Sequence, residues 1–141
     1  MSINGVIQNA KWPELVLTEA SGGAKVDGEN FVKSDNQRWM GEFDYQPEVD
    51  RYIGTIQNKN SGDYLAWDAD MNVVMNGSKY WWKLVVGGGY VGFQVPEKKS
   101  GSEASANATS FYTLELEADK SVILKFQEAD LIQAQLWKIV P

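Results

Sequence analysis

The sequence predicts an all-β fold of twelve short strands in one domain, residues 1–141, and two observations predict it. Runs of alternating or β-branched residues are separated by Gly, Asn, Asp, Ser and Pro, and almost no segment keeps the apolar spacing of a helix. A short segment is also repeated, because residues 5–9 (Gly-Val-Ile-Gln-Asn) return as residues 54–58 (Gly-Thr-Ile-Gln-Asn), with a degenerate copy at 92–95 (Gly-Phe-Gln-Val). A repeated segment of this kind indicates a fold built from similar units.

The strands follow one another along the chain, and turn residues end each of them. We expect strands at 6–8, 15–18, 24–26, 38–43, 52–57, 64–68, 72–75, 80–86, 90–95, 111–117, 122–127 and 135–140, of which 24–26 is the weakest. The one helical pattern, at 128–135, is short and fits equally well as a turn before the last strand. The three consecutive glycines at 87–89 are expected to form a turn between two units.

A tryptophan strand ends each unit. Trp39 and Trp137 each follow a Gln two residues earlier, in the pattern Gln-x-Trp, and Trp82 stands in the same place behind Tyr80. We therefore expect three four-stranded units, at roughly 1–48, 49–88 and 89–141. Because one unit cannot bury both faces of its strands, three units around a pseudo-threefold axis would share one core, and we expect Trp39 and Trp137 to lie in it.

The composition narrows the classes of function. The chain has neither Cys nor His, which excludes disulfides, thiolate metal sites and catalytic triads that use His, so we expect no cofactor and no metal. A net charge of −6 would repel nucleic acid and anionic membranes, and no basic patch offsets it. The amino-terminal residues lack the basic and long apolar regions of a signal peptide, so we expect a cytoplasmic protein.

Six Trp, six Tyr and five Phe are more aromatic residues than a core of this size requires, so some of them are free to face a ligand. Five large rings lie within residues 63–82. Because side chains alternate along a strand, Trp81 and Trp82 must face opposite ways, one inward and one toward solvent or a groove. Sugars suit such a surface, because their C–H faces stack on aromatic rings while amides and hydroxyls bind their hydroxyl groups.

Three four-stranded units that close on Gln-x-Trp resemble the β-trefoil of ricin B-like lectins, and the resemblance covers nearly the whole chain. In detail, residues 67–82 are similar to small β-trefoil lectins of mushroom fruiting bodies, which carry a strand ending in Trp, a Val-Val strand, a polar turn and then Tyr-x-Trp. The resemblance implies a glycan groove in the second unit, lined by Trp67, Met75, Asn76, Gly77, Ser78, Lys79, Tyr80 and Trp82. The Cys-Leu-Asp galactose signature of the larger group is missing, with residues 64–68 in its place, which puts galactose specificity in doubt.

The expected function is therefore that of a lectin that binds glycans or glycoproteins without catalysis, with a role in fungal defence or storage. The first and third units offer little matching aromatic surface apart from Trp12, so we expect one strong site. We expect a monomer or a homodimer. A monomer with one strong site would have low valency, which dimerisation would raise.

Two alternatives remain open at this point. The first is a protease inhibitor that acts through an exposed loop. The candidate loops are residues 97–107 and 44–48, and the residues of the first loop are small, polar and rarely apolar. A glycoside hydrolase needs two carboxylates placed on either side of a sugar, which spacing alone does not reveal. Glu115 and Glu117 alternate with Leu114 and Leu116, so we expect both carboxylates on the solvated face of a half-buried strand.

Overall fold

The computed structural model describes residues 1–20, 25–48, 50–96, 111–127 and 130–141, and these form an all-β structure. All twelve predicted strands are present, and two short 3₁₀ turns, Asp35–Gln37 and Gln133–Gln135, precede β4 and β12. The strands are β1 Ser2–Asn9, β2 Leu15–Glu19, β3 Val26–Asn30, β4 Trp39–Gln46, β5 Arg51–Asn58, β6 Tyr64–Trp67, β7 Val73–Asn76, β8 Trp82–Gly87, β9 Tyr90–Val95, β10 Phe111–Leu116, β11 Val122–Gln127 and β12 Trp137–Val140.

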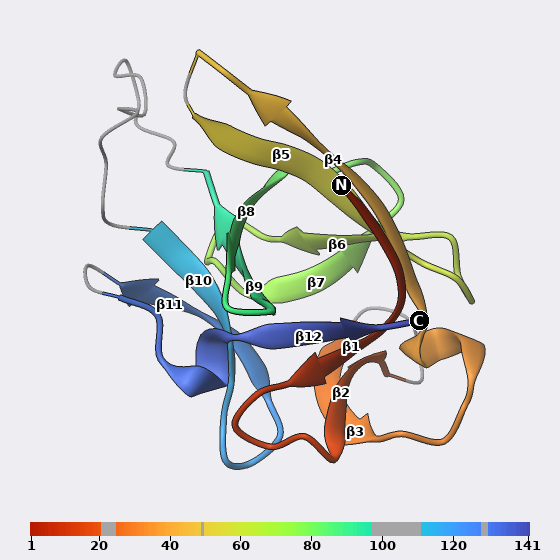
Figure 1. Cartoon of the computed structure of the whole chain (residues 1–141). Coiled ribbons are helices and arrows are strands. Elements are labelled where there is room, and N and C mark those ends of the chain that lie inside the picture. Colours follow the sequence, from red (N-terminus) through yellow and green to blue (C-terminus); the bar gives the residue numbers. More distant parts are fainter. Residues whose placement is uncertain (21–24, 49, 97–110, 128–129) are drawn as a thin grey trace.

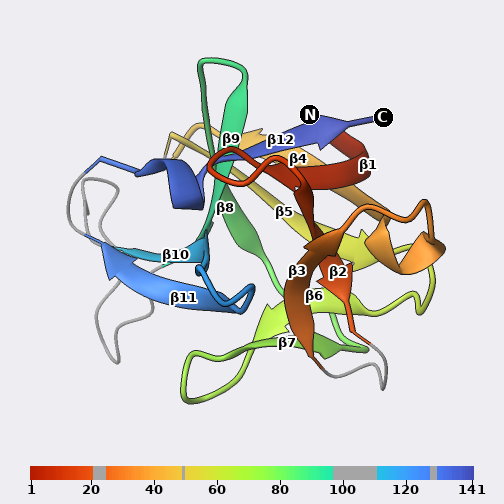
Figure 2. The ribbon, with the colours of Figure 1, turned by 90° about the horizontal axis from the view of Figure 1, so that it is seen from below.

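Six of the strands close into a barrel. Each strand in the cycle β1, β4, β5, β8, β9 and β12 pairs antiparallel with the next, and β12 pairs with β1 to complete the ring. The hairpins β2–β3, β6–β7 and β10–β11 lie outside the ring and join it through β1, β5 and β9 (Figures 1 and 2). Closing the ring leaves no unpaired edge among the barrel strands.

The same tryptophan hydrogen bond recurs three times and ties each outer hairpin to the barrel. The strands β4, β8 and β12 begin at Trp39, Trp82 and Trp137, and all three indoles are fully buried. Each Nε1 donates to a leucine carbonyl oxygen in the preceding hairpin, over 2.9, 2.9 and 3.3 Å, to Leu17, Leu65 and Leu114 in turn. Trp39 and Trp137 are therefore core residues, as predicted.

The first two copies of the repeated segment, in β1 and β5, need a glycine opposite a buried tryptophan. Gly5 lies opposite Trp39 and Gly54 opposite Trp82. A Cβ at Gly5 would lie 2.2 Å from the Val140 carbonyl oxygen, and one at Gly54 would lie 2.1 Å from a carbonyl oxygen of β4, so neither position admits a side chain. In the third copy Val91, and not Gly92, lies opposite its tryptophan, which explains why this copy is degenerate.

The observed strands differ from the predicted ones mainly at their ends. Strand β4 continues to Gln46, beyond the predicted end at 43, because its polar end still pairs with β5. The weak strand predicted at 24–26 is found later, as β3. Of the helical pattern at 128–135, only the 3₁₀ turn Gln133–Gln135 forms, and residues 128–129 lie outside the described residues. Within the described part of the chain, no helix has the length and apolar composition that crossing a bilayer requires.

The Trp39→Phe variant tests the tryptophan hydrogen bond. It leaves the Leu17 carbonyl without its donor and a small void in the core, so we expect the free energy of unfolding to fall by about 3 kcal/mol. Trp81→Phe is the matched control, because Trp81 is exposed, and we expect a change within about 0.5 kcal/mol. Urea unfolding followed by circular dichroism measures both, and equal losses in the two variants would contradict the assigned role.

Candidate functional site

The candidate site lies on β6, β7 and the segment that leads into β8. The turn between β6 and β7 is fixed by Asp68, whose Oδ1 accepts hydrogen bonds of 2.9 Å from the backbone N–H groups of Asp70 and Asn72. The Asn72 side-chain amide donates to Oδ2 of the same carboxylate over 3.1 Å. These bonds from Asn72 and Asp70 lower the pKa of Asp68, because they stabilise its charged form. Asp68 is therefore engaged in holding the turn.

A second turn follows β7 and carries the polar residues of the predicted site. The Asn76 Oδ1 accepts a 2.8 Å hydrogen bond from the Ser78 backbone N–H, the usual way in which an Asn side chain fixes a turn. Gly77, Ser78 and Lys79 are exposed, and Asn76 is half-buried. This turn therefore presents an amide, a hydroxyl and an ammonium group to solvent.

Trp67 packs edge to face against two other aromatic rings, those of Tyr80 and Trp82. The Trp67 ring lies 4.8 Å from the Tyr80 ring and 5.0 Å from the Trp82 ring, centroid to centroid, at interplanar angles of 84° and 88°. Trp67 is 8% exposed and Trp82 is fully buried, whereas Tyr80 is half-buried. Edge-to-face contact is a favourable arrangement for aromatic pairs, so Trp67 fixes the position of Tyr80.

The structure thus divides the eight predicted residues into two layers. The outer layer, at the surface or half-buried, contains Asn76, Gly77, Ser78, Lys79 and Tyr80. The inner layer, buried, contains Trp67, Met75 and Trp82. The assignment of Trp82 as a residue that contacts a ligand is wrong, because its indole has no exposed surface and donates its N–H to Leu65.

Trp81 is not among the eight predicted residues, but it follows them directly in the chain and faces outward. It is 53% exposed, and the Lys79 Nζ lies 6.0 Å from the centroid of its ring. The alternation of side chains correctly predicts that Trp81 and Trp82 face opposite ways. The family pattern Tyr-x-Trp assigns Trp82 to the site. The equivalence of Trp82 with the core residues Trp39 and Trp137, however, identifies Trp81 as the residue that faces outward.

Tyr80 stands two residues before Trp82, where the other two tryptophans that begin barrel strands have a Gln. The buried Gln37 amide, before Trp39, donates to the Thr18 hydroxyl over 3.2 Å, and Gln135, before Trp137, donates to the Glu115 carboxylate over 3.0 Å. The corresponding residues beside Trp82 are Tyr80 and Ala66, which form no such pair. An aromatic ring therefore replaces a structural amide at this position.

Two pockets lined by described residues lie elsewhere on the molecule. One, of about 480 Å³, lies between residues 70–73 of the β6–β7 turn and the strands β10 and β11. The other, of about 260 Å³, lies beside β1 and β2. None of the eight predicted residues lines either pocket.

Glu115 and Glu117 do not have the placement that a glycoside hydrolase needs. Glu115 is only 7% exposed and accepts the hydrogen bond from Gln135, so its prediction as a solvated side chain is wrong. Burial raises the pKa of Glu115 to about 7, and the hydrogen bond to Glu117 and the charge of Glu117 act in the same direction. Two carboxyl groups in direct hydrogen-bond contact cannot flank a glycosidic bond, which requires a separation of about 5 Å or more.

The loops considered for protease inhibition gain no support. Residues 97–107 lie outside the described residues. The other candidate, residues 44–48, is in large part a strand, because Asp44, Tyr45 and Gln46 pair with β5. Among the described residues no group of three or more acidic side chains is placed to hold a metal ion.

Known structures share this architecture. No protein-family model matches the sequence, and no curated protein matches it significantly. A ricin B-like lectin from Macrolepiota procera, in complex with lactose, superposes with a TM-score of 0.66 and 17% identity over 98% of this chain and 93% of that chain. The Rhizoctonia solani agglutinin gives 0.69 and 19% over 99% and 95%.

A GlcNAcα1-4Gal-releasing endo-β-galactosidase from Clostridium perfringens is also similar, with a TM-score of 0.67 and 16% identity over 99% of this chain but only 32% of that chain. These likenesses concern the fold. They confirm the predicted resemblance to ricin B-like lectins, and the twelve-stranded structure with its closed barrel fits a β-trefoil.

The raised pKa of Glu115 predicts a pH-dependent stability. The folded state favours the protonated carboxyl, so its contribution is complete below the ordinary Glu pKa and is lost as the pH rises through about 7. We expect the free energy of unfolding to fall by about 1 to 3 kcal/mol between pH 5 and pH 8. Urea titrations at several pH values measure this fall.

Glu115→Gln should flatten that profile, because the amide retains both hydrogen-bonding partners without a charge. Glu48→Gln, at an exposed position in the β4–β5 turn, is the control and should leave the profile unchanged. A Glu115→Gln variant with the wild-type slope would refute the assignment.

Proposed function

We propose that this protein is a lectin that binds a glycan without catalysis, through the outer layer of the second of three four-stranded units, at about 1–48, 49–88 and 89–141. The recurrence of the tryptophan hydrogen bond at Trp39, Trp82 and Trp137 supports three such units. The structural likeness to a lectin that binds lactose and to an agglutinin supports glycans as the class of ligand.

The observation that carries the proposal is the pair of rings at the surface, Tyr80 and Trp81, next to an exposed polar turn. A sugar presents C–H faces, which stack on aromatic rings, and hydroxyl groups, which need hydrogen-bonding partners. The Ser78 hydroxyl and the Lys79 ammonium group lie within three residues of both rings. Trp81 supplies the larger accessible face, and Tyr80 supplies a ring whose hydroxyl also hydrogen-bonds.

The inner layer supports the site without contacting the ligand. Trp67 holds the Tyr80 ring by edge-to-face contact, and Trp82 anchors the start of β8 through Leu65. A rigid support of this kind lowers the conformational entropy that binding would otherwise cost. The outer layer, together with Trp81, therefore binds, and the inner layer positions it.

The identity of the sugar is open between galactosides and other glycans. Lactose, bound in the Macrolepiota procera lectin, makes a β-galactoside the first probe. The absence of the Cys-Leu-Asp signature, with Tyr64, Leu65 and Ala66 in that region, argues for a broader panel. A single site per chain gives modest affinity, and avidity for a glycan-bearing surface would require two linked sites, as in a dimer.

Binding to a glycan array that includes lactose tests the proposal. We expect Tyr80→Ala and Trp81→Ala each to weaken binding of the preferred glycan about tenfold, which corresponds to about 1.4 kcal/mol per stacking ring. Isothermal titration calorimetry with the preferred glycan measures the loss.

Tyr52→Ala is the matched control, because Tyr52 is also exposed but lies on the β4–β5 hairpin, where it packs against Tyr45. It should retain wild-type affinity. Folded Tyr80→Ala and Trp81→Ala variants that bind as tightly as wild type would exclude this site, and a wild-type protein that binds no glycan on the array would exclude the function.

A further inference from the structure

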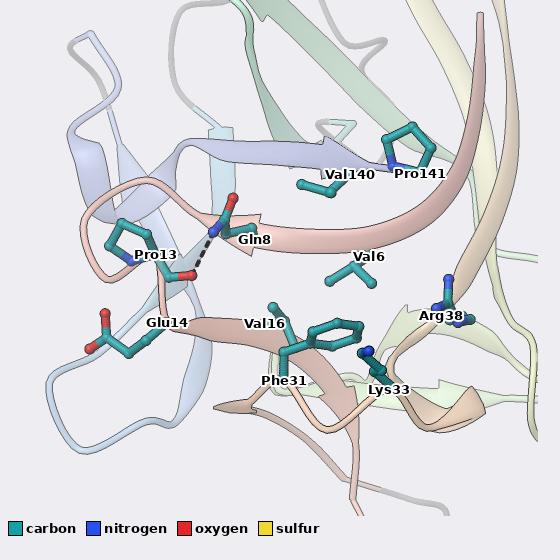
Figure 3. Close-up of a pocket in the computed structure, with 10 residues that line it drawn as sticks. All are labelled: Val6, Gln8, Pro13, Glu14, Val16, Phe31, Lys33, Arg38, Val140 and Pro141. Carbon is teal, nitrogen blue, oxygen red and sulfur yellow. Dashed lines mark hydrogen bonds between the residues drawn. The ribbon is translucent and has the colours of Figure 1, made fainter.

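The 260 Å³ pocket beside β1 and β2 has a chemistry unlike that of the glycan surface. Figure 3 shows its wall, to which β1, β2, the loop after β3 and the end of β12 contribute. Most of its lining is apolar, namely Val6, Pro13, Val16, Phe31, Val140 and Pro141. The Gln8 side-chain N–H is already engaged, because it donates to the Pro13 carbonyl oxygen over 2.7 Å.

Charges of opposite sign mark the two ends of this pocket. In Figure 3, Glu14 lies at one end, and Lys33 and Arg38 lie at the other. Neither cation forms an ion pair with a described acidic residue, since the ion pairs found in the described chain are Met1 with Glu42 and Lys59 with Asp35. Two unpaired cations beside an apolar wall, in a chain of net charge −6, form a local site for an anion.

The loop that carries Phe31 and Lys33 is held in place by one buried side chain. The Gln37 Nε2 donates to the Asn30 carbonyl oxygen over 2.8 Å, and its Oε1 accepts from the Val32 N–H over 2.8 Å. These bonds bracket Phe31, which is 42% exposed. Lys33 has a φ of 61°, which is uncommon for a residue with a side chain. The pocket is thus formed before any ligand arrives, which favours specific binding.

We propose that this pocket binds a small organic monocarboxylate with an apolar body. The carboxylate lies at Lys33 and Arg38, where the guanidinium group can donate two parallel hydrogen bonds to it. The apolar body lies on Phe31 and the valines. A volume of about 260 Å³ equals about nine water-sized volumes, at ~30 Å³ each, and so accommodates an acid of roughly eight carbon atoms. This site is separate from the glycan surface and does not depend on the proposed lectin function.

Calorimetric titration of the full chain with octanoate tests the proposal, with octanol as the uncharged analogue and octyl sulfate as an anion of different geometry. We expect one octanoate per chain, bound at least tenfold more tightly than octanol and more weakly at high salt. Octyl sulfate binding as tightly as octanoate would show a general anion site and would overturn the preference for carboxylate.

The Lys33→Gln/Arg38→Gln variant should bind octanoate at least tenfold more weakly and octanol as wild type does. Lys120→Gln/Lys125→Gln removes the same charge from exposed residues that do not line the pocket, and it should bind octanoate almost as wild type does. Phe31→Ala should weaken the binding of both ligands. Because the Phe31 side chain is exposed, the variant should stay folded, which circular dichroism verifies. Undiminished octanoate binding by Lys33→Gln/Arg38→Gln, or absence of octanoate binding by the wild type, would overturn the proposal.

Discussion

The hydrogen bond from a buried indole to a leucine carbonyl is the constraint on which the rest of the structure depends. It joins each outer hairpin to the strand that re-enters the barrel, at Trp39, Trp82 and Trp137. A buried carbonyl without a donor is costly, so each bond fixes both the direction of the indole and the register of the strand that it begins. The positions of the neighbouring residues, including those at the surface, follow from it.

Because Trp82 provides the buried indole of this bond, the residues just before it are not needed for the core and can form part of the surface. The residue before it, Trp81, must face outward, and the residue two before it need not be a structural Gln such as Gln37 or Gln135. Tyr80 occupies that place and packs on Trp67. Compared with Gln37 and Gln135, Tyr80 lacks the amide hydrogen bond of a structural Gln and adds aromatic surface.

The sequence predicts the fold well because strand alternation and the repeated tryptophans both report on burial. All twelve strands form, and 90–95 and 122–127 match residue for residue. Strand ends such as that of β4 are missed, because pairing with β5 continues where the apolar pattern has ended. At the site, alternation shows that Trp81 and Trp82 point apart, and the equivalence of Trp82 with Trp39 and Trp137 indicates that Trp82 is the inward one. The contact of Trp67 with both Tyr80 and Trp82 could not be predicted, because it depends on how β6 lies against the start of β8 in the folded chain.

The pairing of β1 with β12 has a consequence for synthesis of the chain. The barrel is closed by its first and last strands, with Val6 opposite Val140 and Asn9 opposite Trp137. Until β12 has left the ribosome, the nascent chain can form its hairpins, but one edge of β1 has no partner and the ring stays open. Closing the barrel therefore requires a contact between strands far apart in the sequence, which costs more loop-closure entropy and forms more slowly than the hairpins do.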